Sequence, residues 1–429
     1  MSDPDGMGRS VPYHAPRLSG LLGACAGLLI GSAALAQDQN DGPILRLGLS
    51  TSAQFNTNRS LDTDDTGSTT DLSARLDFLL RFATPIQSLD LSGDIGLRTV
   101  NGATEGELAT GIVDPSLRFS YTRQSRDAQL DASAFYVERD VFASELQFDP
   151  VTADFDLLDT SGTQRQFGFD ARLELRRRAP FGITLSAGFT GLRFSDTTDP
   201  DLTDEDRFRA GLGLRFDLNP VTQATVDMRL STFEDFGAGE GRQDTYTLNT
   251  AVRRTLSNGS LRLSANIEDT EDGTRYTLRG ARGFETDIWR VTGSLGLTRE
   301  VDGDIATVGG VDLAYDLPNG AITAEFDRTI RSGTDDAEEE VTSLALGYRT
   351  QLNALTGFNA QFSFTDRKAT GAGDDGRFAT LSLAVQRQLT RDWSVNVGLE
   401  HRIVDDDSSG RADDSLLRVS LRRDLLARR

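Results

Sequence analysis

Apolar and polar side chains alternate along most of the chain from Ile44 onward, which is the pattern of a half-buried β-strand. Residues 72–82 place Leu, Ala, Leu, Phe, Leu and Phe on one face, and mainly Ser, Arg and Asp on the other. Residues 207–217 and 393–400 repeat the arrangement. Such segments run about 10–13 residues, which is long for a soluble strand but suits a tilted crossing of a bilayer.

The connections between these segments alternate between short turns and longer polar loops. Nine short turns include Asn219-Pro220, Asn258-Gly259 and Pro318-Asn319-Gly320, whose residues favour tight turns. With ten longer loops they join about twenty strands, and both chain termini then lie on the short-turn side. We therefore expect an all-β fold: a closed antiparallel transmembrane β-barrel of about 20 strands (range about 18–22), with short periplasmic turns and longer extracellular loops. The longest loop, 139–163, either adds a hairpin or folds into the lumen.

Charge is distributed unequally between the two ends. The ten loops together contain 41 acidic and 7 basic residues, whereas the short turns and the Arg-rich C-terminal tail are neutral to basic. A β-propeller would show a repeated aromatic mark, and a β-solenoid would not alternate short and long connections. The asymmetry favours a barrel with its acidic loops outside the cell. The net charge of −21 argues against nucleic-acid binding.

Residues 1–36 have the pattern of a cleaved secretory signal peptide. Arg9 and Arg17 precede an apolar stretch that ends in Ala34-Leu35-Ala36, a small-x-small cleavage site. A lipoprotein cleavage box at Cys25 is the alternative. Residues 37–429 then form a single barrel domain, and only about seven residues precede its first strand. We expect no plug domain of the kind that energised receptors need.

The composition supports strands rather than helices in the membrane. Hydrophobic residues make up 37% of the chain and the mean hydropathy is −0.36. No segment after residue 36 offers the roughly 20 apolar residues that a spanning helix needs. A transmembrane β-barrel has no such apolar run, because only alternate residues of its strands face lipid. Cys25 is the only cysteine, so the barrel would have no disulfide.

The opening run Ile44–Leu49 leads into an Asn/Asp-rich first loop, and hairpins with acidic outer loops follow to the end. This pattern resembles the large porin-like outer-membrane barrels of proteobacteria, some of which accompany exopolysaccharide export systems. The resemblance implies a place in the cell outer membrane, with lipid, lipopolysaccharide and the outer-membrane assembly machinery as partners. One departure concerns assembly: such barrels commonly end in an aromatic residue, whereas this chain ends in Ala427-Arg428-Arg429.

Charged residues on the polar strand faces are the candidate lumen-lining residues. They alternate with apolar residues and so should point inward, where they either select among solutes or pair with one another across strands. The candidates are Arg75, Arg98, Arg118, Arg172, Arg215, Arg229, Arg253, Asp77, Asp94 and Asp227.

Catalytic, cofactor-binding and metal-binding sites are not expected. His401 is the one histidine of residues 37–429, and it follows an apolar strand face. We interpret it as a residue at the membrane–water boundary rather than the base of a lipase-like site. Acidic runs such as Asp405-Asp406-Asp407 are expected to contact divalent cations loosely, beside lipopolysaccharide phosphates.

These observations predict a porin-like channel, not an enzyme, for passive passage of small polar solutes or a glycan. The alternative is a structural or surface-interaction barrel. Its lumen would be closed by paired side chains, and its acidic loops would contact cations or lipopolysaccharide.

Overall fold

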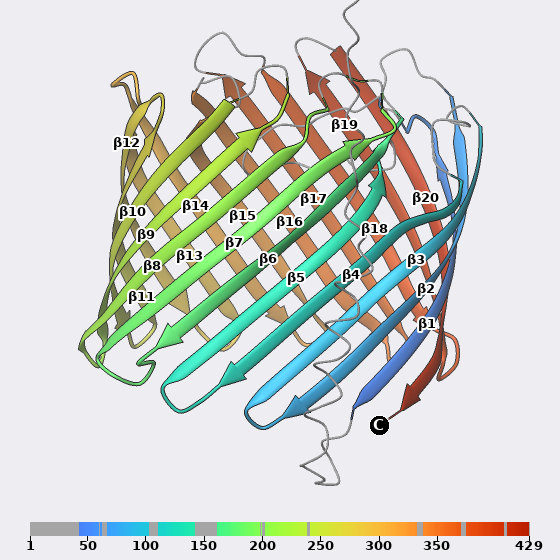
Figure 1. Ribbon diagram of the computed structural model, residues 1–429, viewed down its shortest axis with the longest axis horizontal. Helices are drawn as coiled ribbons and strands as arrows, with labels where there is room; N and C mark the ends of the chain where they lie inside the picture. The colour runs from blue at the N-terminus through green and yellow to red at the C-terminus, as the bar shows by residue number, and fades with distance from the viewer. Residues whose placement is uncertain are drawn as a thin grey trace, which may run out of the picture. The chain divides into compact units, whose positions relative to one another are not determined.

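The computed structural model describes residues 43–59, 61, 67–102, 110–141, 161–197, 199, 202–237, 241–332, 338–369, 375–406 and 410–428. In this part of the chain, twenty antiparallel strands form one sheet that closes on itself (Figure 1). The strands are β1 (Ile44–Asn56), β2 (Thr69–Thr84), β3 (Gln87–Gly102), β4 (Gly111–Gln124), β5 (Ala128–Asp140), β6 (Thr163–Leu175), β7 (Phe181–Ser195), β8 (Glu205–Asn219), β9 (Thr222–Asp235), β10 (Gly241–Leu256), β11 (Gly259–Thr270), β12 (Gly273–Glu285), β13 (Trp289–Arg299), β14 (Ile305–Leu317), β15 (Gly320–Ser332), β16 (Glu338–Asn353), β17 (Thr356–Ala369), β18 (Gly376–Gln388), β19 (Trp393–Asp406) and β20 (Gly410–Arg428).

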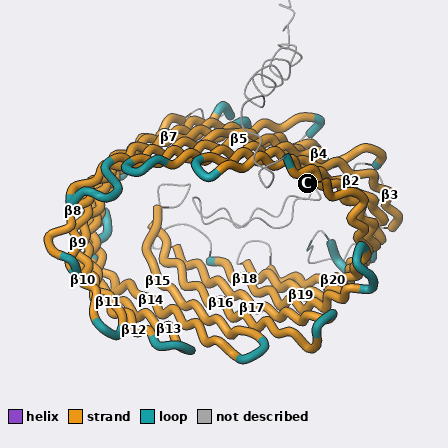
Figure 2. The backbone as a smooth tube through the Cα atoms, turned by 90° about the horizontal axis from the view of Figure 1, so that it is seen from below, coloured by secondary structure: helices purple, strands orange, loops and turns teal. Residues whose placement is uncertain are grey.

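Each strand pairs with its neighbours in the chain, and β1 pairs with β20 to close the ring (Figure 2). The register of this closing pair sets Ser52 opposite Ser420, with an irregularity at Leu47/Gly48. The predicted closed antiparallel barrel of twenty strands is confirmed. The described residues contain no helix long and apolar enough to cross a membrane.

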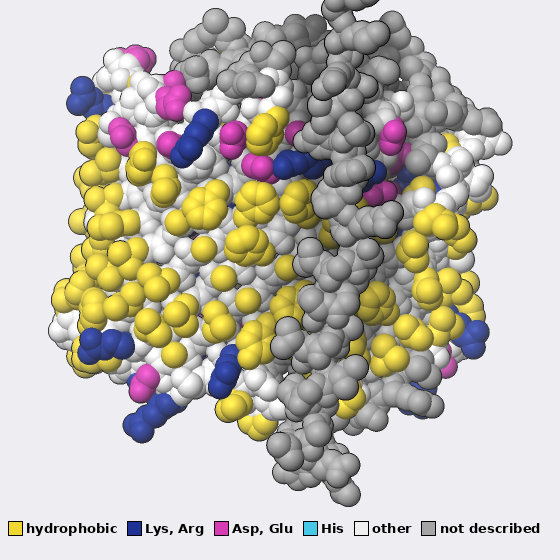
Figure 3. Space-filling model, in the orientation of Figure 1, with side chains coloured by type: hydrophobic (Ala, Val, Ile, Leu, Met, Phe, Trp, Pro, Cys, Tyr) yellow, Lys and Arg dark blue, Asp and Glu magenta, His cyan; other side chains and the backbone are white. Residues whose placement is uncertain are grey.

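The alternation of the sequence becomes two faces of the wall. Leu72 and Leu76 of β2 are 50% and 47% exposed on the outer face, and large exposed hydrophobic side chains recur on strand after strand. Figure 3 shows them as a band across the face in view, with charged side chains above and below it. The arrangement follows from the solvent: lipid requires apolar side chains outside, whereas a water-filled interior accepts polar ones.

Aromatic pairs lie close to the short-turn end of this wall. Trp289 packs against Tyr315 with ring centroids 5.0 Å apart, and Phe181 packs against Phe216 at 5.1 Å. Aromatic rings prefer the boundary between lipid and water, and outer-membrane barrels carry girdles of them there. The short-turn end therefore has the chemistry of a membrane boundary.

The strands differ from the expectation in length. They run from 11 residues in β13 to 19 in β20, so most extend beyond the predicted 10–13. At the long-loop end, the loop predicted at 268–273 is shorter, because β11 ends at Thr270 and β12 begins at Gly273, whereas the loop predicted at 300–304 joins β13 and β14 as expected. Backbone pairing continues past the apolar part of a strand because polar side chains are tolerated outside the bilayer.

Two expectations lie outside the described residues. The predicted signal peptide, residues 1–36, is one of them, and most of the 139–163 loop is the other. Within that loop, Val141 and Gly162 are described, and the Val141 backbone N–H donates to the Gly162 carbonyl at 2.9 Å.

Candidate functional site

The inner face of the barrel is the candidate site, because it brings together polar side chains from every strand. The ten predicted lumen-lining residues lie on the strand faces opposite the exposed hydrophobic side chains. Met228, for example, is 49% exposed between Asp227 and Arg229, and Val252 is 46% exposed beside Arg253. Charged residues of this face divide into paired groups near the rim and less paired groups along the wall.

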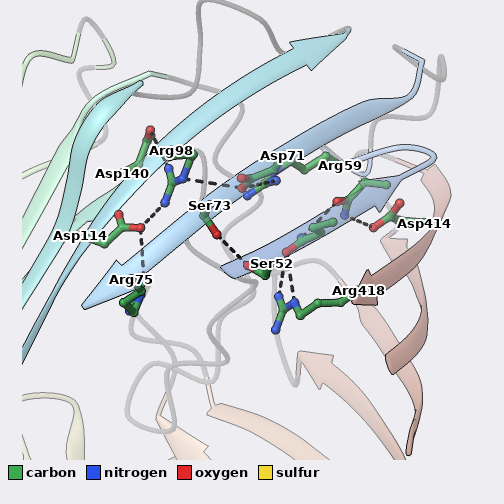
Figure 4. A network of polar contacts seen from close by, with 12 residues as sticks. Ser52, Arg59, Asp71, Ser73, Arg75, Arg98, Asp114, Asp140, Asp414 and Arg418 are labelled. Atoms are coloured by element: carbon green, nitrogen blue, oxygen red, sulfur yellow. Dashed lines mark hydrogen bonds and ion pairs between the residues drawn. The ribbon is translucent and has the colours of Figure 1, made fainter. Parts of the chain in front are cut away.

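The rim network, centred on Arg98, lies at the long-loop end of β2 to β5 (Figure 4). The Arg98 side chain is only 7% exposed and contacts three carboxylates. Its guanidinium donates to Asp114 and lies 3.6 Å from Asp71 and 3.5 Å from Asp140. Arg75 extends the network, because it lies 3.5 Å from Asp114 and donates to Asp94 at 2.7 Å. Three predicted lining residues, Arg75, Arg98 and Asp94, therefore belong to one ion-pair chain.

The seam cluster, centred on Asp414, joins the start of the chain's barrel to its end. The Asp414 side chain is fully buried. It accepts hydrogen bonds from the backbone N–H groups of Thr57 and Asn58 at 3.0 and 2.9 Å, and from Asn56 Nδ2 at 3.1 Å. The Arg402 guanidinium donates to the same carboxylate at 2.5 Å. Buried charges are stable only when paired and hydrogen-bonded in this way.

Arg59 follows the seam cluster in the loop after β1. Its guanidinium lies 3.8 Å from the Asp71 carboxylate, and both side chains are about nine-tenths buried. Burial lowers the pKa of Arg59, although the negative charge of Asp71 opposes the shift. The loop side chain thus links the rim network to the region of the seam cluster.

Near the short-turn end, three predicted residues line one cavity of about 640 Å³: Arg172, Arg215 and Asp227. Arg215 donates to the backbone carbonyls of Arg177 and Ala179 at 2.8 and 3.0 Å. It therefore holds the turn between β6 and β7 in place.

A larger cavity of about 880 Å³ follows the inner face of β8 to β12. Six arginines along this wall line it: Arg207, Arg209, Arg229, Arg262, Arg275 and Arg279. Arg209 and Arg279 each have one carboxylate nearby, at 3.7 and 3.5 Å. In the described part of the chain, neither Arg229 nor Arg262 has an ion pair or a hydrogen bond to another side chain. The alternation predicted Arg229 as a lining residue. Arg262 was not among the predicted residues, although Leu261 and Leu263 flank it in the same alternating pattern.

The next stretch of the inner face, from β13 to β19, carries acids as well as arginines. Asp312 of β14 and Glu325 of β15 are directly opposed in register and line a third cavity of about 640 Å³. Glu400 of β19 lines the same cavity and accepts a hydrogen bond from Ser382 at 3.1 Å. Arginines line this cavity too, and Asp312 also lines the larger one, so both stretches carry both signs of charge.

The remaining predicted residues are not part of these cavities. Asp77 pairs bidentately with Arg422 of the last strand, at 3.0 and 2.8 Å. Arg118 and Arg253 are exposed and, among the described residues, contact no carboxylate. Neither of these two contributes to the lining of the three cavities.

His401 lies beside Ser415 of the neighbouring strand, with Nδ1 at 2.9 Å from the serine Oγ. This pair has the spacing of a base and a nucleophile. The described residues supply no hydrogen-bonded acid that would orient the imidazole, which a catalytic triad needs. The contact is a polar pair near the long-loop end of β19 and β20.

Comparison with solved structures identifies the architecture. The siderophore receptor PirA from Pseudomonas aeruginosa matches with a TM-score of 0.51 at 10% identity, over 91% of this chain and 82% of that chain. A mutant of the ferric enterobactin receptor PfeA from the same organism, in complex with enterobactin, matches with a TM-score of 0.54 at 9% identity, over 90% of this chain and 82% of that chain. This chain has the fold of a large outer-membrane β-barrel.

At such low identity the likeness shows the fold of the outer-membrane barrel and not its ligand. No protein-family model matches the sequence, and a search of curated proteins gives no match. The resemblance to large outer-membrane barrels therefore holds at the level of fold. An association of this outer-membrane barrel with exopolysaccharide export has no support from the comparisons.

Proposed function

We propose that this chain is a porin-like channel of the cell outer membrane that lets small polar solutes pass passively. One observation carries the proposal: arginines such as Arg229 and Arg262 face an interior cavity of about 880 Å³ without carboxylate partners. An interior that served only to stabilise the wall would pair its charges, as the rim network does. Unpaired, solvent-accessible charges along a lumen are what select and conduct solutes in channels.

Electrical recording tests this function. The refolded barrel, added to a planar bilayer in potassium chloride, should give discrete conductance steps, whereas heat-denatured protein should not. If no conductance steps appear in many independent trials, the proposed channel function is wrong.

A glycan is the alternative solute in this proposal, and liposome swelling separates it from smaller solutes. Vesicles containing the barrel should swell in arabinose and more slowly in longer oligosaccharides. Equal rates for a monosaccharide and a hexasaccharide would favour the glycan conduit. In either case the partners that we propose are outer-membrane lipid, lipopolysaccharide and the assembly machinery.

A structural barrel with a closed lumen is the second candidate function. Its support is a group of acids at the long-loop end: carboxylate oxygens of Glu300, Asp302 and Glu338 lie within 4.8 Å of one another. Such a group suits loose contact with divalent cations. This function predicts calcium-dependent binding to lipopolysaccharide vesicles by a barrel that gives no conductance.

A further inference from the structure

We infer that the inner wall formed by β8 to β12 binds small anionic solutes through their carboxylate or phosphate oxygens. The inference rests on the proposed function, because it names the class of solute for the same lumen. The cavity along this wall measures about 880 Å³. Ligand pockets commonly measure about 300–1,000 Å³, so a small organic anion fits with its hydration water.

Arg229 and Arg262 are the two residues of this wall on which the inference rests. The register places Arg229 level with Thr247 of β10 and Glu268 of β11, so the two arginines lie at different heights and offer separate contacts to an anion. Both are exposed to the cavity and, within the described ranges, make no side-chain ion pair. A guanidinium carries five N–H donors in a planar fork that matches a carboxylate or a phosphate. These two residues therefore present unused donors and uncompensated positive charge to the lumen.

The register between β10 and β11 adds an independent observation. Arg253 and Arg262 are directly opposed across the two strands, on the same inner face. Side chains in this position have Cβ atoms about 4.5–5.5 Å apart, and like charges there are destabilising. Among the described residues no carboxylate contacts either guanidinium. A bound anion would offset this electrostatic repulsion, so binding of an anion beside the pair is favourable.

Uncharged polar side chains fill much of the rest of the cavity wall. They supply hydroxyl and amide groups that hydrogen-bond to the polar parts of a solute: Ser231, Thr247, Asn249, Ser264, Asn266 and Thr277. Asn249 and Asn266 are directly opposed in register on this part of the wall. Their side-chain N–H groups are donors of the kind that carboxylate or phosphate oxygens accept.

The acids that reach the same cavity gather toward its long-loop end. Glu268 pairs with Arg275 at 3.2 Å, and Glu271 and Asp272 form the turn between β11 and β12. From β14, on the same side of the barrel, Asp312 also reaches the cavity. These acids repel an anion at the long-loop end and beside β14. Arg262 lies on β11 toward the short-turn end, away from Glu268 and its neighbours.

The test compares two double variants that remove the same charge. Arg229→Gln with Arg262→Gln removes the site. Arg81→Gln with Arg290→Gln removes two inner-face arginines that already pair, with Asp90 and with Glu285. The probe is gluconate, and sorbitol of the same carbon number is its uncharged control; inorganic phosphate forms a second arm.

The expected result is a preference for chloride over potassium in the reversal potential of the unmodified channel, with block of its current by gluconate and not by sorbitol. The site variant should raise the half-blocking gluconate concentration about tenfold, and the control variant less than about twofold. If phosphate blocks in place of gluconate, the site prefers phosphate oxygens within the same class. A conducting channel whose gluconate and phosphate block is the same in all three proteins overturns the inference and leaves the proposed function intact.

Calorimetry with the detergent-solubilised barrel separates the two claims when no conductance is found. If the site variant loses gluconate or phosphate binding and the control variant retains it, the anion site is supported. The lack of conductance then contradicts only the channel function. No heat of binding for either probe would overturn the anion site.

Discussion

Two groups of arginines on the same inner face differ in what surrounds them. Arg98 and Arg402 are less than one-tenth exposed and each contacts two or three carboxylates. Arg229 and Arg262 are exposed and contact none among the described residues. The residue type and the alternation are identical in the two groups, so only burial and neighbouring acids distinguish the first group, which stabilises the wall, from the second, which we propose contacts solutes.

The largest expected effect is that of Arg98→Met. Removing the cation leaves Asp71, Asp114 and Asp140 together at low exposure, and breaking such a buried group costs about 3–5 kcal/mol. Urea unfolding of the refolded barrel measures the loss. The matched control is Arg118→Met, an exposed inner-face arginine, which should change the free energy of unfolding by less than about 0.5 kcal/mol. Equal losses for the two variants would contradict the structural role of the rim network.

Asp414→Ala should follow with a loss of about 1.5–3 kcal/mol, because hydrogen bonds to a charged group are lost and Arg402 keeps Glu400 at 3.7 Å as a neighbour. The same unfolding measurement applies. Asp413→Ala is the control, since Asp413 is the exposed neighbour in the chain. A seam cluster that does not stabilise closure would leave both variants equal to the unmodified barrel.

Arg262→Gln tests the exposed group of arginines in the same comparison. We expect the free energy of unfolding to stay within about 0.5 kcal/mol, with a slight gain because the repulsion by Arg253 is removed. A loss as large as that of Arg98→Met would mean that Arg262 is structural, and the two groups would then not differ.

The smallest effect concerns pH and Glu300, a 6%-exposed acid of the 300–304 turn. Burial raises the pKa of Glu300, and the neighbouring acid Glu338 raises it further. A raised pKa means stability that is fully present below the unfolded value of about 4.3 and is lost as pH rises through the folded value. Glu300→Gln should therefore flatten the decline in unfolding free energy as pH rises above the unfolded value, whereas the exposed Glu271→Gln should not. Parallel profiles for the unmodified barrel and Glu300→Gln would contradict this assignment.

Much of the fold could be predicted because alternation and turn chemistry are local. The period of two identified the strands, and the turn residues gave their number within the expected range. The shortened connection at Glu271-Asp272 could not be predicted, because acidic residues read as a loop even where backbone pairing continues through them. The closing contact between Asp77 and Arg422 depends on a register 345 positions apart in the chain, which no local pattern encodes.

Only part of the candidate site could be predicted from the sequence. Alternation places Arg98, Arg215 and Arg229 on one face, but it does not say that Arg98 meets three acids or that Arg215 holds a turn. Those distinctions depend on which residues lie two or three strands away. The like-charged pair of Arg253 and Arg262 depends on the register of one hairpin, set by the tight turn at Gly259, where φ is +134°.

The contact between Asp414 and residues 56–58 also has a consequence for the order of assembly. β1 needs β20 on one edge, and the partners are about 358 positions apart. During synthesis the first strand therefore keeps an open hydrogen-bonding edge until the last strand exists, and an open edge is a template for aggregation. Contacts of such separation form late because a long loop must close first. The contacts of the Asp414 carboxylate would then be among the last to form. A chaperone that covers the edge of β1 would be needed until β20 pairs with it.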